Sequence, residues 1–251
     1  MQDVIKVMKN KYQLQRPESK MPEFQVFFND QASNDFNTFF KCLPKEREYL
    51  AAVVAGSFHD RLFPVSSIYF AHSSYALLWL SQFGKDMKKF LDARAKEIVV
   101  GGMMTIIMPG IPDEMRYSEL SNSVMHETMA SIFMDMASEG LISEDQVDSF
   151  NLPIYAASPA EMAALVEKNG HFSIERLELT NTAPQLDGPI DIPAWVMHVR
   201  AAMEEMFTTH FEDEIIEEMF NRLANKLLEL SDEVESRFWK RIQLLLVLMR
   251  K

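Results

Sequence analysis

Two short apolar runs in the first quarter of the chain end in residues that could bind a nucleoside. Asp30 closes the run FQVFFND, and Ser57 and Phe58 close the run AAVVAGSF. A carboxylate at the carboxyl end of a parallel strand can accept the hydrogens of both ribose hydroxyls. A serine hydroxyl can donate to a ring nitrogen, and a phenyl ring can cover an adenine face. Each pattern also occurs in ordinary turns, so both interpretations stay open.

A third group of chemically useful residues follows the apolar run SIYFAHSS. If a helix begins near Ser74, Tyr75 and Trp79 lie four residues apart on one face of it. A phenol and an indole each carry a hydrogen-bond donor on an apolar body. Such a pair suits a planar carboxylic acid whose ring is buried while its charge is held. An aromatic pair in the hydrophobic core is the alternative.

Oxygen-bearing groups are concentrated in DSFNLPIY. The Asp148 carboxylate, the backbone carbonyl of Phe150 and the Asn151 side chain lie within one turn of chain. Oxygen ligands are those that Mg²⁺ prefers in proteins. A helix cap or an Asx-turn uses the same residue types. The segment is therefore a candidate metal site, with a turn as the alternative.

The sequence contains no motif for nucleophilic or metal-dependent hydrolysis. Its six histidines do not form an HExxH pattern, and Cys42 has no histidine close to it in the chain. Neither a GxSxG turn nor a phosphate-binding GxxxxGK loop occurs. Hydrolysis by these mechanisms is therefore excluded.

Composition and charge limit the class of protein. The 251 residues are 47% hydrophobic, which is enough for one core in a single domain spanning 1–251. The formal net charge of −12 would repel nucleic acid, which we exclude as a partner. Cys42 is the sole cysteine and the first residues do not resemble a signal peptide. These two features favour a reducing, cytoplasmic location. No apolar run approaches the roughly 20 residues of a membrane-spanning helix, so we expect a soluble protein.

Hydrophobic periodicity predicts the elements that must position these residues. Short apolar runs alternate with amphipathic segments in the first part of the chain, which is typical of βα units in a mostly parallel sheet. Helical segments at about 111–150 and 194–232 are expected to cap this sheet. A surface loop is expected at 181–193, which contains three prolines. Strands are predicted at 24–30, 51–58, 67–74, 103–108, 171–180 and 241–251, and helices at 34–43, 90–99, 117–139, 158–170 and 208–230.

The order of these motifs resembles that of a known family. FFNDQASNDFNTFFKCLP, VAGSFHDRLFP, FAHSSYALLWLSQ, FLDARAKEIVVGGMMTIIMPG and EGLISEDQVDSFNLPIYAASPAEM are similar to motifs of the plant SABATH methyltransferases, over nearly the whole chain. The resemblance implies an α/β fold: a Rossmann-like methyltransferase sheet with a helical cap. It also implies a homodimer that transfers a methyl group from S-adenosylmethionine to a carboxylate, or in some members a ring nitrogen, of a small plant metabolite.

The resemblance also assigns roles to individual residues. Carried over by motif, the cofactor-binding residues are Asp30, Gln31, Ser57, Phe58, Ser74 and Tyr75, the substrate-binding residues are Tyr75, Leu78 and Trp79, and the Mg²⁺ ligands are Asp148, Phe150 and Asn151. Gln31 stands where the family usually has Leu, and Leu78 falls where members differ and substrate choice is set. No catalytic acid or base is expected, because a carboxylate is already ionised at neutral pH. Catalysis would rest on alignment of the reacting atoms.

The sequence departs from the family pattern in two places. The glycine-containing motif of the family's first strand, which resembles DLGCSSGPNT, is absent, and MQDVIKVMKNKYQ matches the helix that follows it. WLSQFGKDMKKFL passes directly from the aromatic motif into the next helix, without the family's Asn-Lys-Gly segment and its Mg²⁺ ligand. Because the absent strand is the central one, we expect its neighbours to lack a hydrogen-bond partner. The chain by itself is then expected to bind S-adenosylmethionine weakly or not at all.

Three hypotheses about the chain stay open at this point. It is a truncated or alternatively spliced methyltransferase, a non-catalytic product that dimerises with intact relatives, or an incomplete gene model. An in-frame glycine motif upstream in the genome would favour the first or the third. Co-purification with a full-length relative would favour the second.

Overall fold

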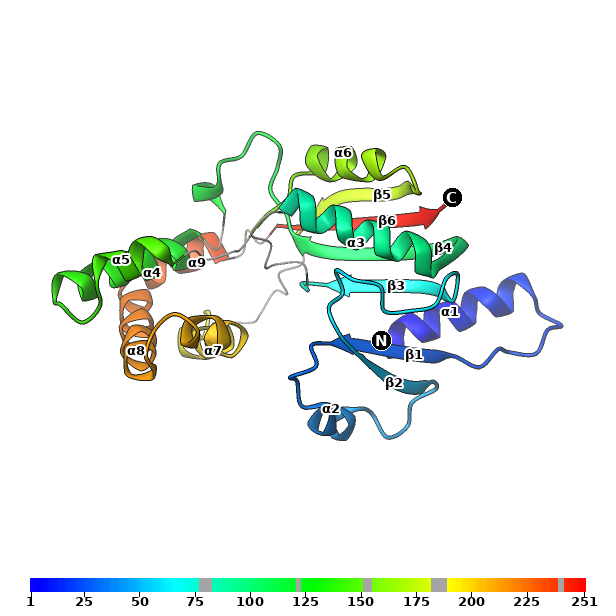
Figure 1. The fold of residues 1–251 in the computed structure, drawn as a ribbon, viewed down its shortest axis with the longest axis horizontal. Helices are drawn as coiled ribbons and strands as arrows, with labels where there is room; N and C mark the ends of the chain where they lie inside the picture. Colours follow the sequence, from blue (N-terminus) through cyan, green and yellow to red (C-terminus); the bar gives the residue numbers. More distant parts are fainter. Residues whose placement is uncertain (77–82, 121–122, 151–154, 182–188, 239–241) are drawn as a thin grey trace.

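The computed structural model describes residues 1–251 except 77–82, 121–122, 151–154, 182–188 and 239–241. Figure 1 shows strands with flanking helices in one part of the molecule and a group of helices in the other. The helices are α1 (Gln2–Gln15), α2 (Phe36–Cys42), α3 (Phe83–Glu97), the 3-10 helix η1 (Tyr117–Glu119), α4 (Ser123–Ser138), α5 (Glu144–Ser149), α6 (Pro159–Asn169), α7 (Ile192–Thr208), α8 (Asp213–Glu229) and α9 (Ser231–Phe238). The strands are β1 (Gln25–Asp30), β2 (Leu50–Ala55), β3 (Ile68–Ser74), β4 (Ile98–Pro109), β5 (Phe172–Thr180) and β6 (Gln243–Arg250).

The described strands form two separate sheets. β1 and β2 pair in parallel, from Gln25 opposite Leu50 to Asp30 opposite Ala55. The second sheet has the order β3-β4-β6-β5, in which β3 is parallel to β4 while β6 is antiparallel to both β4 and β5. Within the described ranges, β1 and β3 each pair along one side only. The sheet is thus divided between β1 and β3 in the part of the chain that the structure describes.

The alternation of buried residues identifies the strands that carry the core. Met104, Ile106 and Met108 of β4 are fully buried, as is Leu246 of β6. Because every second residue is buried, one face of the sheet packs against α3 and α6, which contribute residues to the same core cluster. β3 has no fully buried residue, and Tyr69 is 76% exposed. Parallel strands are normally covered on both faces. β3 is less covered than that and stands at the edge of its sheet.

The helices at 123–149 and 192–238, named here the helical module, share a second core. Its buried centre includes Met129 of α4, Phe207 of α7 and Leu227 of α8. α8 buries apolar residues at three- and four-residue spacing, as an amphipathic helix does. The Arg222 guanidinium on α8 also reaches the carboxylate of Glu139, just after α4, at 2.7 Å. The helical module is thus held by its own apolar contacts and ion pairs.

The N-terminal helix covers the two-stranded sheet. Ile5 of α1 is buried against Val26 of β1 and Tyr49, which directly precedes β2. The expectation of a helix in MQDVIKVMKNKYQ is confirmed. The described helices include none that is both long and apolar enough to cross a membrane.

Local sequence signals set the ends of several elements. The Ser158 side chain accepts a hydrogen bond from the N–H of Glu161, and Gly170 ends α6 in the left-handed conformation, with φ of 73°. β5 confirms the strand predicted at 171–180 and shows a register shift between Ile174 and Arg176. The predicted helix at 117–139 is divided, because η1 ends in an extended residue at Leu120 and α4 begins only at 123.

Candidate functional site

Asp30 and Ser57 lie next to each other at the carboxyl ends of β1 and β2. Asp30 pairs with Ala55, and its carbonyl accepts a hydrogen bond of 2.9 Å from the N–H of Gly56. The Asn29 side chain, which the sequence analysis did not select, donates to the carbonyls of both Val54 and Gly56, at 2.8 and 2.9 Å. These hydrogen bonds hold the ends of β1 and β2 together. The exposed Asp30 carboxylate directly follows Asn29, which makes two of them.

Gly56 makes the turn that leads from β2 into the loop carrying Ser57. Its φ of 143° is a conformation that side chains disfavour, and a Cβ there would lie 3.1 Å from Cδ2 of Leu62. Ser57 is exposed, and its Oγ accepts a hydrogen bond from the N–H of His59. Phe58 is half-buried, with its ring packed edge-on against Phe90 of α3. The turn thus presents the serine to solvent while the phenyl ring anchors the loop.

Tyr75 stands at the carboxyl end of the other sheet in a strained conformation. Its φ of 56° lies in the left-handed region, which costs a non-glycine residue roughly 1 kcal/mol. Its N–H donates to the carbonyl of Ile107, and its hydroxyl donates to Oε1 of Gln243, both at 2.8 Å. Because β4 lies between β3 and β6, the tyrosine side chain crosses the end of β4. Strained backbone held in this way is frequent at ligand sites.

A helix beginning near Ser74 is the condition for placing Tyr75 and Trp79 on one face, and neither Ser74 nor Tyr75 is helical. Ser74 is the last residue of β3 and pairs with Ile107 of β4. Tyr75 cannot be the first residue of a right-handed helix at its positive φ. Leu78 and Trp79, the predicted substrate contacts, lie outside the described residues.

All the parallel strands end on the same side of the molecule. The arrows of β1, β2, β3 and β4 point toward the helical module in Figure 1. In open α/β sheets, ligands bind outside the carboxyl ends of the strands. Asp30, Ser57 and Tyr75 therefore all stand on the side where a ligand is expected, the first two on one sheet and the third on the other.

The predicted metal cluster is only partly within the described residues. The exposed Asp148 lies in the last turn of α5, and the ring of Phe150 packs among Phe133, Phe207 and Phe211. Asn151 lies outside the described residues. In the ranges that the structure describes, no three His, Cys, Asp or Glu side chains are placed to hold a metal ion. One carboxylate and one carbonyl fall short of the roughly six oxygens of a Mg²⁺ shell.

Two tyrosine pairs are electrostatically distinctive. The Tyr155 hydroxyl donates to both carboxylate oxygens of Glu161, at 2.8 Å each. Burial, followed by this hydrogen bond, raises the pKa of Tyr155 to about 12. The Tyr117 hydroxyl of η1 lies 2.9 Å from Nδ1 of His126 on α4, and burial lowers the pKa of that imidazole. Burial also raises the pKa of Tyr117, so both tyrosines are neutral hydrogen-bonding groups at physiological pH.

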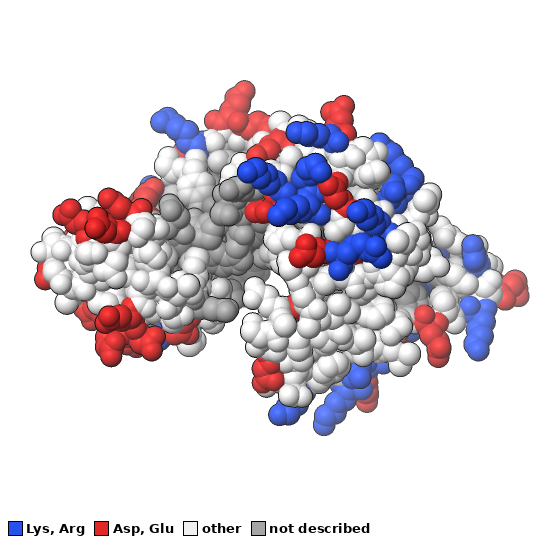
Figure 2. Space-filling view, viewed as in Figure 1, with Lys and Arg blue, Asp and Glu red and all other residues white. Residues whose placement is uncertain are grey.

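Charge is unevenly distributed over the surface. Figure 2 shows acidic side chains gathered on the helical module and basic side chains gathered over the part that holds the sheets. The basic residues of α3 are interspersed with acids, and Lys88 pairs with Asp92 at 2.6 Å. The basic surface is thus partly neutralised by its neighbours.

This fold is that of the S-adenosylmethionine-dependent methyltransferases. It matches the solved structure of loganic acid methyltransferase with SAH, with a TM-score of 0.93 and 37% sequence identity, covering 100% of this chain and 80% of that one. The chain belongs to the family described as SAM dependent carboxyl methyltransferases, whose family model matches residues 1–85 and 78–251. The SABATH resemblance is confirmed.

Two similar proteins are plant methyltransferases. Loganic acid O-methyltransferase of Catharanthus roseus is 37% identical over 286 residues, covering 100% of this chain and 76% of the relative. Salicylate carboxymethyltransferase of Clarkia breweri is 32% identical over 272 residues, covering 92% and 75%. The first alignment is longer than the 251 residues of this chain, so the relative carries residues within it that this chain lacks. The two matched segments of the family model meet at 78–85, which agrees with an internal segment absent at WLSQFGKD.

Proposed function

We propose that this chain carries the adenosine-binding and substrate-covering parts of a methyltransferase for a small plant carboxylic acid. Asp30 binds the ribose with Gln31 beside it, and Ser57 and Phe58 meet the adenine. The hydrogen bond of 2.9 Å between the Asp30 carbonyl and the Gly56 N–H carries this proposal, because it sets a ribose acceptor beside an adenine-facing turn.

The substrate side of the proposed site begins at Ser74 and Tyr75. The Tyr75 side chain reaches across the end of β4 to Gln243, and Leu78 and Trp79 complete the proposed substrate contacts. S-adenosylmethionine supplies an activated methyl group when bound. A carboxylate is already ionised at neutral pH, so the residues of this chain act by excluding water and aligning the carboxylate oxygen.

Weak cofactor affinity of the isolated chain follows from the sheet edges. β1 and β3 have no described partner between them, and the sequence has no glycine turn of the family type to hold the methionine part of the cofactor. The adenosine part would still find Asp30 and Ser57. We therefore expect binding in which the adenosine protons of SAH contact the protein and its amino-acid protons do not.

Saturation-transfer difference NMR with SAH tests this proposal, because the method detects weak ligands. The purified chain is expected to saturate the adenine and ribose protons, and Asp30→Asn is expected to reduce these signals at least threefold. Asp3→Asn, on the exposed first turn of α1, is the matched control. No adenosine signal from the unmodified chain, or equal signals from the Asp30 variant, would contradict the assignment.

The substrate class is tested with the same protein. We propose a small carboxylic acid, since the relatives are named for loganic acid and salicylate. Incubation with labelled S-adenosylmethionine and a panel including loganic, salicylic and benzoic acids should give methyl esters if the chain turns over. The uncharged amides of the same acids should give none. Label transferred equally to acids and amides would exclude a carboxyl acceptor.

Assembly, location and metal binding complete the proposal. We propose a cytoplasmic homodimer, which analytical ultracentrifugation and a fluorescent fusion in plant cells would check.

For Mg²⁺, Asp148 and the Phe150 carbonyl are the described oxygen donors, with Asn151 as the third predicted ligand. We derive no catalytic step from this site, because the described donors do not fill a Mg²⁺ shell.

A further inference from the structure

Arg94 and Glu97 form a buried ion pair in the last turn of α3. Nε of Arg94 lies 2.8 Å from Oε2 of Glu97, and the two side chains are 8% and 1% exposed. A charge pair at this depth is stabilising only when the remaining donors and acceptors are also satisfied. The partners of this pair therefore indicate what it does.

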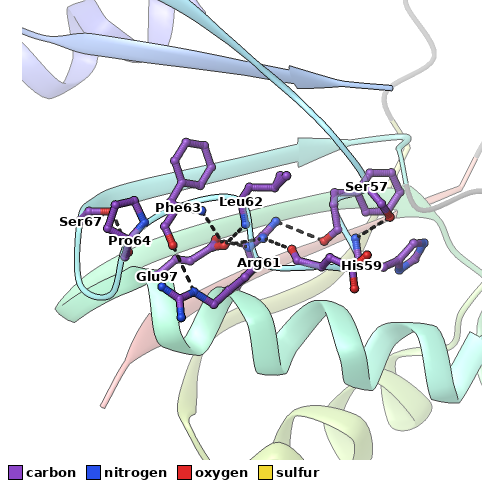
Figure 3. A network of polar contacts seen from close by, with 11 residues as sticks. Ser57, His59, Arg61, Leu62, Phe63, Pro64, Ser67 and Glu97 are labelled. Carbon is purple, nitrogen blue, oxygen red and sulfur yellow. Dashed lines mark hydrogen bonds and ion pairs between the residues drawn. The ribbon is translucent and has the colours of Figure 1, made fainter. Parts of the chain in front are cut away.

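Glu97 holds the loop at 57–63, named here the adenine loop, through its backbone. Oε1 of Glu97 accepts hydrogen bonds from the N–H groups of Leu62 and Phe63, the latter at 3.0 Å. Figure 3 shows the Glu97 side chain pointing from the end of α3 into the curve of this loop. The carboxylate thus fixes the second half of the adenine loop.

Arg94 holds the first half of the same loop. Its Nη1 and Nη2 donate to the carbonyls of Phe58 and Asp60, at 3.3 and 2.9 Å. Its guanidinium carbon also lies 5.4 Å from the centre of the Phe90 ring, against which Phe58 packs edge-on. The guanidinium therefore ties the backbone of Phe58 to α3 and contacts the ring of Phe90, on which the Phe58 ring packs.

The position of Glu97 is unfavourable for the helix alone. A negative charge at the C-terminal end of a helix faces the negative end of the helix dipole, and burial removes its hydration. The N–H groups of Ser66 and Ser67 donate to the carbonyls of Lys96 and Glu97, so the chain after the adenine loop already caps this end. Helix capping thus does not require the carboxylate, whereas the adenine loop does.

We propose that Arg94 and Glu97 are positioning residues for cofactor binding. They hold the adenine loop in the shape in which Ser57 and Phe58 meet the adenine, without touching the cofactor themselves. The inference rests on the proposed function, which assigns the adenine to Ser57 and Phe58. It goes beyond it by naming the two residues that set the loop.

Replacing both charges tests the proposal while the fold is kept. Arg94→Met combined with Glu97→Leu leaves no unpaired buried charge, and such exchanges are often tolerated. In this variant, hydrogen exchange of the Leu62 and Phe63 amides should be at least tenfold faster, and the Kd for SAH at least tenfold higher. Exchange of the Ile106 amide in the core of β4 should be unchanged, which separates release of the loop from unfolding.

A conservative variant and a matched control complete the test. Arg94→Lys keeps the charge, but an ammonium group lacks the planar set of donors that reaches two carbonyls and the carboxylate. The Kd for SAH should therefore rise less than in the double variant, by about threefold. Arg176→Lys alters an exposed ion pair on β5 and should change neither measurement.

The possible results separate this inference from the proposed function. A faster-exchanging adenine loop together with a raised Kd in the double variant supports it. Unchanged exchange at Leu62 and Phe63 overturns it whether or not SAH binds, and so does a released loop with an unchanged Kd. If the unmodified chain gives no SAH signal, the proposed function fails before any variant is compared, and the cofactor role of the pair fails with it.

Discussion

The hydroxyl of Tyr75 donates a hydrogen bond of 2.8 Å to Oε1 of Gln243, although 168 positions separate the two residues in the sequence. Tyr75 follows an edge strand and Gln243 begins the strand on the other side of β4. The bond therefore holds a candidate ligand-binding side chain across the sheet. It also compensates in part for the strained backbone of Tyr75.

We predict an energetic coupling between these two residues. Tyr75→Phe and Gln243→Leu each remove one partner, and a hydrogen bond of this type contributes about 0.5–1.5 kcal/mol. A double-mutant cycle measured by urea denaturation should give a coupling free energy in that range. Strictly additive effects of the two substitutions would mean that the bond does not hold Tyr75 in solution.

Gly56→Ala should destabilise the protein by more than about 1 kcal/mol, because alanine is strained at this φ and its Cβ would press on Leu62. Gly84→Ala is the matched control, since a Cβ at this position in α3 meets nothing within 4 Å. The control should be neutral or stabilising by about 0.5 kcal/mol. Thermal unfolding followed by circular dichroism measures both, and equal effects would remove the special role of Gly56.

Acidification should loosen the helical module through His126. Burial lowers the pKa of this imidazole, so the unfolded chain takes up the proton more readily than the folded one. The resulting stability is present above the ordinary histidine pKa and is lost as the pH falls through the lower folded pKa. His126→Gln should therefore flatten the fall of melting temperature between about pH 7 and 5.

In the His126 variant, we expect His72 to account for part of the remaining fall of melting temperature with pH. Burial, and then repulsion from the N-terminal amino group, lower the pKa of His72 on β3 in the same direction. Replacing both histidines should make the melting temperature still less dependent on pH. An unchanged slope in the His126 variant would show that its imidazole is not protected in the folded state.

Met129→Ala should test whether the helical module is a separate core. The side chain is fully buried among α4, α7 and α8, and its truncation should cost about 2–5 kcal/mol. Hydrogen exchange should accelerate in these helices and stay slow in β4 and β6. Leu246→Ala in the sheet is the reciprocal control, and equal acceleration in both parts after either substitution would mean that they unfold as one unit.

Much of the fold could be predicted because the information is local. The alternation of Met104, Ile106 and Met108 identifies a strand with one buried face, and Ser158 and Gly170 mark the ends of α6. These patterns depend on residues a few positions apart, whose interactions are the same in most proteins. The same holds for Asp30 and Ser57, since strand ends can be located from their apolar runs.

The tertiary structure decided which distant segments contact each other. No residue near Tyr75 in the sequence indicates that Gln243 is its partner. The four-residue spacing of Tyr75 and Trp79 likewise does not show that Ser74 pairs as a strand residue with Ile107. Likewise, Glu97 is an ordinary polar position in a charged helix until the loop at 57–63 folds over it. The amino-acid sequence determined the elements and the residues able to do the chemistry. Their partners were set by the packing of the chain, because burial and hydrogen-bond satisfaction are properties of the whole fold.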